Sequence, residues 1–317
     1  MEPSTMPQQF PFPVDNQLTP IVMAFKNRRM IADEALPRFP VAGMNYRYSE
    51  YDLSQGLTIP ETAVGRRARP NKVVFTASER NGATTDHALD DEVPQADVDN
   101  APAAQKNLIA RTSERLANLI ALRREIRVAE KLFDESSYPA ANKTTLSGAA
   151  QFSDAASDPI GLLTDIMDGM IYRPNVMVFG RRAFTKFARH PAVVKAINHT
   201  SGDSGFVRQQ DVAALFELDR VLVGEAFVNI ARKGQTPELQ RAWGPHIALY
   251  FLDDLGGPSE SPSFGFTAQF GARLAGQWPD KNIGMRGGTV VRVGESVEEV
   301  IAAPSLGYFI ENAIADD

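Results

Sequence analysis

The longest regular pattern of apolar positions lies between residues 104 and 134. Apolar side chains recur there at intervals of three and four, Arg and Glu fill most other positions, and no Gly or Pro interrupts the run. This spacing places the apolar residues on one face of an α-helix. The face comprises Leu108, Thr112, Leu116, Leu119, Ile120, Ile126, Ala129 and Phe133. At 1.5 Å per residue the helix would be roughly 45 Å long, and its single stripe predicts a spine laid across a sheet.

Residues 158–245 alternate between short helical and extended patterns. "DPIGLLTDIMDGMI" predicts a helix with Asp158 as N-cap and Pro159 at the first helical position. "NVMVFG" predicts a buried strand that ends at Gly180, and the helices that follow it are broken at Pro191. A helix in "VRQQDVAALF" and a strand in "RVLVGEAFVNI" complete an α/β domain.

The junction of strand, glycine and helix at Gly180 raises the question of a phosphate site. Such a site needs several glycines, because backbone N–H groups must approach and cradle the anion. Gly180 stands alone, and the chain contains neither G-x-G-x-x-G nor G-x-x-x-x-G-K-[ST]. Arg181 and Arg182 at the start of the helix are more typical of a solvated face. The junction is therefore interpreted as a structural turn.

Residues 246–317 are rich in strand patterns separated by Gly and Pro. They include "HIALYFLD", "SFGFTAQFG", "GTVVRVGE" and "EEVIAAPSLGYFIENAI". Nothing apolar precedes the spine helix that could cover its stripe, so we expect the stripe to pack on this β-rich tail. The residues expected to be largely buried by it within one chain are Leu116, Leu119, Ile120 and Phe133.

Two segments before the spine helix lack a core of their own. Residues 1–40 begin with Pro and Gln and show little periodicity, which is typical of an extended arm. Residues 41–100 predict a hairpin with strands in "MNYRYSEYDL" and "NKVVFTASE", and Tyr46 and Tyr48 on one face. Because a long two-stranded hairpin is not stable alone, we expect most of both segments to be buried against neighbouring copies.

The hairpin region carries two charge clusters of opposite sign. Its tip, "SQGLTIPETAVGRRARP", is basic, and the segment after the hairpin, "DHALDDEVPQADVD", is acidic and is interpreted as a connector. The basic tip of one copy could meet the acidic segment of another; the alternative is that both runs are solvated loops. The candidates for contacts between subunits are Arg66, Arg67, Arg69, Lys72, Asp90, Asp91, Glu92, Tyr46 and Tyr48.

Composition narrows the class of protein. A chain of 317 residues with 43% hydrophobic content is globular and long enough for two domains. The net charge of -6 disfavours a dedicated nucleic-acid reader but is compatible with a container for DNA. No apolar run is long enough for a membrane helix, and the start, "MEPSTMPQQFPFP", lacks a secretory signal. We therefore expect a cytoplasmic protein without a membrane partner.

The residue types that carry most enzymatic chemistry are absent or scattered. The chain has no cysteine, which excludes disulfides, thiolate zinc sites and cysteine nucleophiles. The histidines are far apart and none lies in H-E-x-x-H: His87, His190, His199 and His246. The adjacent carboxylates Asp90–Asp91 and Asp253–Asp254 are typical of solvated turns, and no G-x-S-x-G occurs. We expect no catalytic, cofactor or metal site.

The order of these parts resembles the major capsid protein of tailed bacteriophages, whose α+β fold is shared with encapsulins and herpesvirus capsid floors. The resemblance extends to "NVMVFG" at 175–180, to F-x-x-F-x-x-H-P-x-V at 184–193 and to "LFELDRVLVGEA" at 215–226. It assigns a family name to each part. The parts are the N-arm (1–40), the E-loop hairpin with its acidic connector (41–100), the spine helix with part of the P-domain (101–157), the A-domain (158–245) and the returning P-domain strands (246–317).

The resemblance implies a structural protein and not an enzyme. It would self-assemble into hexamers and pentamers of an icosahedral shell that encloses double-stranded DNA, without a cofactor. It would be made in the host cytoplasm and end in the virion. The implied partners are further copies, a separate scaffolding protein, a portal, a decoration protein and packaged DNA bound without sequence specificity.

Some members of that family are cross-linked by an isopeptide bond from a loop lysine to an asparagine. Lys72 is the lysine of this loop but lies past the tip, so we expect no such bond. Two alternatives to a phage capsid remain. An encapsulin-like shell would enclose enzymes, although the Pro- and Gln-rich arm differs from the N-terminal helix of such shells. A cytoplasmic α/β enzyme would need motifs that the chain lacks.

Overall fold

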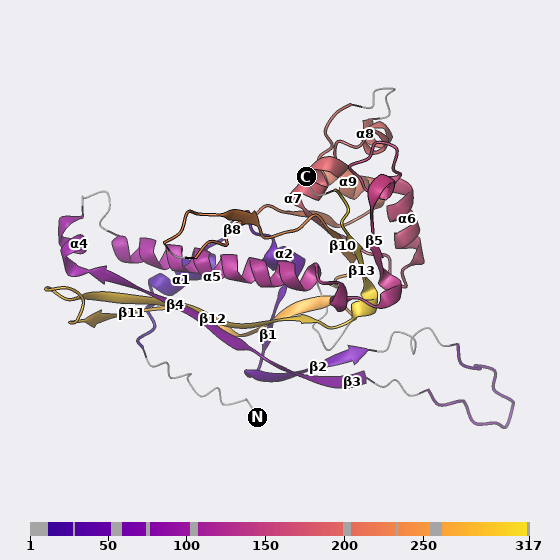
Figure 1. The fold of residues 1–317 in the computed structure, drawn as a ribbon. Coiled ribbons are helices and arrows are strands. Elements are labelled where there is room, and N and C mark those ends of the chain that lie inside the picture. The colour runs from indigo at the N-terminus through magenta and orange to yellow at the C-terminus, as the bar shows by residue number, and fades with distance from the viewer. Residues whose placement is uncertain are drawn as a thin grey trace.

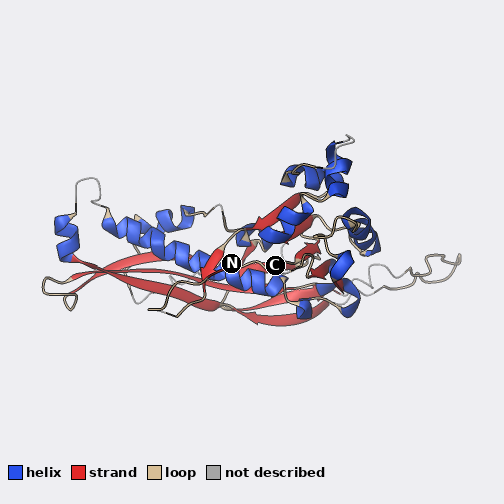
Figure 2. Ribbon diagram, turned by 45° about the horizontal axis from the view of Figure 1, so that its top comes forward, coloured by secondary structure: helices blue, strands red, loops and turns tan. Residues whose placement is uncertain are grey.

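The computed structural model describes residues 12–27, 29–51, 59–73, 77–101, 107–198, 204–232, 234–253 and 262–315. Those residues form a long, flat body of sheet and helix with an α/β body at one end (Figures 1 and 2). A hairpin projects from the same end as the α/β body (Figure 1). None of the described helices is both long and apolar enough to cross a membrane.

The long body is built on a sheet in the order β1-β11-β12-β4. Its strands are β1 (Arg38–Val41), β11 (Gly265–Asp280), β12 (Gly288–Ile301) and β4 (Thr85–Pro94). β11 and β12 form a long antiparallel hairpin, β4 runs antiparallel to β12, and β1 runs parallel to β11. Strands from both ends of the chain therefore lie in one sheet, with β1 and β4 at its edges.

The spine helix is α5 (Leu108–Leu132), and it lies along one face of this sheet (Figure 2). Leu116 and Ile120 are buried in a cluster with Val291 and Val293 of β12. The predicted packing of the spine on the C-terminal strands is therefore confirmed for these two residues.

The prediction was wrong for Leu119, whose side chain is 51% exposed. The buried face is turned toward Ser113, Arg124 and Glu125, which are buried although they are polar. Counting only apolar positions therefore misplaced the centre of the stripe. Phe133, just beyond the helix, is half-buried against the α/β body, with its ring 5.2 Å from that of Trp243.

The α/β body contains a sheet in the order β5-β13-β10-β6-β7. The strands are β5 (Lys143–Thr145), β13 (Gly307–Glu311), β10 (Ile247–Tyr250), β6 (Val176–Gly180) and β7 (Arg220–Gly224). β10 and β13 were expected among the returning strands of the long body, but they pair within this sheet. Periodicity could not show this, because a fully buried strand fits the centre of either sheet.

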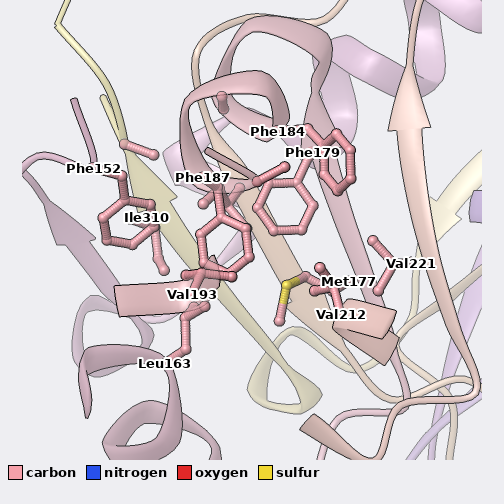
Figure 3. Close-up of a cluster of buried hydrophobic side chains, with 14 of the residues drawn as sticks. Phe152, Leu163, Met177, Phe179, Phe184, Phe187, Val193, Val212, Val221 and Ile310 are labelled. Carbon is pink, nitrogen blue, oxygen red and sulfur yellow. The ribbon is translucent and has the colours of Figure 1, made fainter. Parts of the chain in front are cut away.

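Four helices cover this sheet, and all four lie where local signals in the sequence predicted them. They are α6 (Pro159–Gly169), α7 (Arg181–Phe187), α8 (Pro191–Asn198) and α9 (Gln209–Phe216). The Asp158 side chain accepts a 3.0 Å hydrogen bond from the Gly161 N–H, as expected of the N-cap. The core beneath the helices gathers Phe179, Phe184 and Phe187 with aliphatic side chains from neighbouring elements (Figure 3).

Gly180 is a turn between a core strand and a helix, as interpreted from the sequence. A Cβ atom at this position would lie 1.8 Å from the carbonyl oxygen of Gly244. The backbone of the segment before β10 therefore occupies the space of a side chain, and only glycine fits.

Residues 1–40 were expected to be an extended arm without a core. The described residues of this segment instead form short helices that pack on the rest of the chain. The described residues from Phe12 onward include α1 (Leu18–Ala24) and α2 (Ala32–Ala35), followed by β1. Leu18 and Val22 are buried against α5 and the long sheet. The expectation failed because these helices are too short to produce a clear period. Residues 1–11 lie outside the described part.

The hairpin consists of β2 (Asn45–Tyr51) and β3 (Ala77–Ala83), which are antiparallel. Its base rests on the same chain: the ring of Tyr46 is buried, and its hydroxyl donates a 2.6 Å hydrogen bond to Glu298. Tyr48 lies edge-on to Phe266 at 5.8 Å. The tip, residues 59–73, is exposed at every position. Residues 52–53 and 74–76 of the predicted strands, and residues 54–58 of the predicted tip, lie outside the described residues.

The acidic segment after the hairpin is a strand, β4, and a short helix, α4 (Gln95–Asn100), rather than a connector. Val93 is buried in the cluster under α5, while most side chains of β4 are exposed. The charges obscured the strand because β4 is an edge strand. Its partner β12 also lies about 200 residues away, with Arg292 of β12 pairing with Asp90 at a separation of 202.

The remaining elements are short. A separate two-stranded ribbon is formed by β8 (Phe227–Asn229) and β9 (Leu239–Arg241). Single 3-10 turns occur at Glu135–Ser137, Ala140–Asn142, Gly148–Ala150 and Pro304–Leu306.

Candidate assembly surface

A cluster of charged side chains, all largely buried except the half-exposed Asp33, fastens the N-terminal segment to the spine helix and the long sheet. Its members are Arg38, Arg124, Arg127, Arg273, Asp33, Glu295 and Glu299. Opposite charges that are withdrawn from water must pair closely to offset their desolvation. The cluster therefore favours one arrangement of the three elements over others.

Arg124 is the centre of this cluster, and its side chain is only 2% exposed. Its guanidinium donates to Asp33, to the Leu36 carbonyl oxygen at 3.0 Å and to Thr267 Oγ1 at 2.9 Å. Burial, followed by repulsion from Arg38, lowers the pKa of Arg124 to about 10. It stays charged at neutral pH and ties α5 to both α2 and β11.

Glu295 is the main carboxylate on the sheet side. It accepts hydrogen bonds from Arg38 Nη1 at 2.8 Å and from Arg273 Nε at 2.9 Å. Burial alone would raise the pKa of Glu295, but the two guanidinium groups hold it below its ordinary value. The carboxylate therefore remains ionised and holds β1 against β11 and β12.

Glu125 joins the N-terminal segment to the α/β body. Its buried carboxylate accepts from the backbone N–H groups of Ile31 and Ala32 at 3.0 and 2.8 Å, and from Trp243 Nε1 at 2.7 Å. Burial raises the pKa of Glu125. Because Trp243 precedes β10, this one side chain links α2, the spine and the α/β body.

We predict that Asp33→Asn destabilises the subunit at neutral pH and that the difference from wild type shrinks in acid. Burial would raise the pKa of Asp33, but Arg124 and Arg38 lower it to about 2. A carboxyl whose pKa is depressed by folding stabilises the protein above its unfolded pKa, near 4, and that stabilisation is lost as the pH falls toward 2. Urea unfolding at pH 7, 4 and 2.5 measures the free energy of unfolding of both proteins. A difference between them that stays constant across this range would contradict the lowered pKa of Asp33.

The hairpin tip, residues 59–73, takes no part in the charge cluster around Arg124 or in the contacts of Glu125. Ile59 and Val64 are both exposed, Ile59 at 93%. In the described structure no ion pair involves the basic residues of the tip, which are Arg66, Arg67, Arg69 and Lys72. The tip extends away from the rest of the molecule (Figure 1).

The acidic candidates on β4 differ from one another. Asp90 is paired within the chain, because Arg292 donates to both of its oxygens at 2.6 and 2.5 Å. Asp91 and Glu92 are exposed on the edge strand, and no ion pair involves them in the described residues. Within one chain, therefore, neither Asp91 nor Glu92 forms an ion pair with the basic residues of the tip. Tyr46 and Tyr48 pack on their own chain at the base of the hairpin.

The histidines are placed separately. His190 is buried, where its Nε2 lies 3.0 Å from the Asp154 carbonyl oxygen and its Nδ1 accepts from the Ala192 N–H. It holds a loop in place. His87 lies on β4 and His246 beside Phe309. Among the described residues, no group of His, Asp and Glu side chains could hold a metal ion. His199 and Asp254 lie outside them.

Comparison with known proteins decides the family. Residues 70–229 match the family model described as phage major capsid protein E. The chain is 51% identical over 305 residues to the major capsid protein of Pseudomonas phage JBD67, covering 96% of this chain and 98% of that protein. The chain belongs to the phage major capsid protein E family. It is therefore a structural protein of a phage capsid and not an enzyme.

Solved structures show that this capsid protein has the predicted phage capsid fold. A crystal structure of a phage-related protein from Bordetella bronchiseptica RB50 matches with a TM-score of 0.74 and 23% identity, over 95% of this chain and 98% of that one. The capsid structure of cyanophage P-SCSP1u matches with a TM-score of 0.58 and 10% identity, over 91% and 89%.

Sequence reasoning on this capsid protein missed the buried charge cluster. A signal was present, because Arg124 and Glu125 follow Ile120 on the apolar stripe, where a surface helix would carry apolar side chains. Charged residues at such positions indicate pairing with another element. The carboxylates that pair with Arg124, Asp33 and Glu299, are distant in sequence and could not be found without the fold.

Proposed function

We propose that this capsid protein assembles as hexamers and pentamers into a closed icosahedral shell around double-stranded DNA. The observation that carries the proposal is the hairpin tip, residues 59–73, which is exposed at every position while its base is fixed to the sheet. An isolated subunit gains nothing from such a projection. A tiled shell can bury it on a neighbouring copy.

The proposal includes the setting of the shell. Assembly would take place in the host cytoplasm, with a separate scaffolding protein and a portal, and the product would be the virion. A decoration protein on the outer surface is a further proposed partner. The net charge of -6 supports enclosure of DNA without sequence-specific binding.

Electron microscopy of the purified recombinant protein tests the proposal. We expect closed shells, or rings of the size of a hexamer or pentamer. Nuclease protection of DNA in particles from infected cells then tests the contents. A discrete dimer or monomer at all concentrations, with or without co-expressed scaffold, would contradict assembly.

We further propose that the tip of one copy meets the edge strand of its neighbour. Arg66, Arg67 and Arg69, with Lys72, would lie near the exposed carboxylates of Asp91 and Glu92. Each exposed ion pair contributes about 0.2 to 1 kcal/mol, but the contact is repeated at every copy. Weak contacts that can break and re-form allow a growing shell to correct errors.

Reversing the charge of all three tip arginines to Glu is expected to leave the subunit folded and to impair assembly. High salt should partly reproduce the defect in wild type, because exposed pairs are screened within about 10 Å at 0.1 M. Sedimentation measures the shell yield, and circular dichroism checks folding. The triple change to Gln is the graded control, with a smaller defect. Adding Asp91→Arg and Glu92→Arg to the Glu variant should restore shells. Normal shells from the Glu variant alone would mean that the tip is a solvated loop and makes no contact needed for assembly.

A further inference from the structure

The ribbon β8–β9 carries large apolar side chains that remain exposed in the single chain. Phe227 lies opposite Arg241, and Asn229 opposite Leu239, so these four residues share one face of the ribbon. Phe227 is 49% exposed and Leu239 is 66% exposed. The Arg241 guanidinium lies over the Phe227 ring at 4.3 Å. The face is thus an apolar patch with a basic rim.

Such a ribbon is poorly stabilised by its own contacts. Among the described strands, β8 and β9 pair with each other, through three residues each. A two-stranded ribbon of this length is marginal in water. A face of this composition is typical of a surface that is covered in an assembly, since aromatic residues and Arg are enriched in protein interfaces.

A second exposed apolar patch follows α6. Ile171, Tyr172 and Arg173 are consecutive exposed residues, with Ile171 53% exposed. Arg173 lies 3.3 Å from Asp168 and 3.7 Å from Glu217, and both carboxylates face solvent. The rim of this patch therefore carries two carboxylates and one guanidinium, so its net charge is negative and opposite in sign to that of Arg241 on the ribbon.

The two patches lie at opposite ends of the same pair of strands. β6 and β7 are parallel. Ile171–Arg173 precede β6 and Glu217 precedes β7, whereas the ribbon begins just after β7 ends. The patches therefore cannot meet within one chain. They can meet when two copies are arranged head to tail.

We propose that the β8–β9 ribbon of one copy docks on the Ile171–Arg173 patch of the next copy. Leu239 and Phe227 would cover Ile171 and Tyr172, and Arg241 would approach Glu217. Contact between two different patches is heterologous, and its repetition gives a closed ring when the rotation between copies is a whole fraction of a turn. The inference rests on the proposed assembly into shells and names the contact that links neighbours within each ring.

The chain has no cysteine, so introduced thiols give a direct test. Leu239→Cys and Ile171→Cys are made separately, co-expressed, assembled and treated with a short bis-maleimide. We expect mixed dimers and no product from either variant alone. The double variant should give a ladder that ends at the closed ring. Met285→Cys, at a 96% exposed turn, replaces Leu239→Cys as the matched control and should give no mixed dimer.

The outcomes separate this contact from the proposed shell function. Absence of shells or rings from wild type would overturn the proposed function. Normal shells without mixed dimers would overturn this contact alone, and so would dimers of Leu239→Cys with itself, which would indicate a two-fold contact. If a cysteine variant folds but does not assemble, a charge-exchange pair of variants tests the contact instead. Arg241→Glu alone should prevent shell assembly, and adding Glu217→Arg should restore it. Failure to restore shells would contradict the contact.

Discussion

Arg124→Met is expected to destabilise the unassembled subunit by about 3 to 5 kcal/mol, because it breaks a buried charge network by removing one partner. Methionine fills much of the space of the side chain but provides no donor. The carbonyl oxygen of Leu36 and the hydroxyl of Thr267 would lose their buried guanidinium. Glu299, which is also buried, would lose a nearby positive charge.

Urea denaturation of unassembled subunits, followed by circular dichroism, measures this effect. The matched control is Arg47→Met, because Arg47 pairs with Glu79 at 2.9 Å while both side chains are largely exposed. An exposed pair contributes about 0 to 1 kcal/mol. Equal losses for the two variants would show that the buried network does not stabilise the fold.

Phe187→Ala is expected to cost a similar amount, about 3 to 5 kcal/mol, by opening a cavity in the core of the α/β body. The Phe187 ring is fully buried and lies 5.3 Å from that of Phe179 and 5.8 Å from that of Phe152 (Figure 3). These neighbours come from a strand and from the loop before α6, so one truncation removes contacts with several elements.

Thermal and urea unfolding of the unassembled subunit measure this loss, with near-UV circular dichroism reporting on the aromatic core. Phe206→Ala is the matched control, because Phe206 is about half exposed beside Phe184. We expect the control to cost less than about 1 kcal/mol. A comparable loss in the control would mean that Phe187 does not occupy the core.

Local signals in the sequence were sufficient for the four helices and for strand β6 of the α/β body. The Asp158 cap, the break at Pro191 and the strand that ends at Gly180 depend on neighbouring residues, and the structure has all three. The reason that Gly180 must be glycine was different. It depends on Gly244, which approaches it only in the folded chain.

The pairing of strands distant in sequence could not be predicted from local signals. The charged residues of β4 are typical of a solvated segment, and nothing near them in sequence shows that β12 is the partner strand. The assignment of β10 to the α/β sheet likewise depends on pairing with β6 and β13. The order of parts along the chain was predicted, but not which sheet each strand joins.

The exposure of the candidate assembly residues within one chain could be predicted in part. The run of basic residues located the exposed tip correctly, because Arg66 and its neighbours are exposed in the single chain. This exposure is expected both for a solvated loop and for a contact with another copy. Tyr46, which was selected for its place on one face of a predicted strand, is instead buried in its own chain. A tyrosine on one face of a strand has the same sequence pattern whether its own sheet or a neighbour covers it.

The parallel pairing of β1 with β11 sets an order of events during synthesis. Leu36, next to β1, accepts a hydrogen bond from Thr267, which is 231 residues away. At about 5 to 20 residues per second, the ribosome needs roughly 10 to 50 s to make that intervening chain. The N-terminal segment is thus without its sheet partner for most of translation. The long body can form only after residues up to β12 have been made, so newly made subunits complete the folding of this body late.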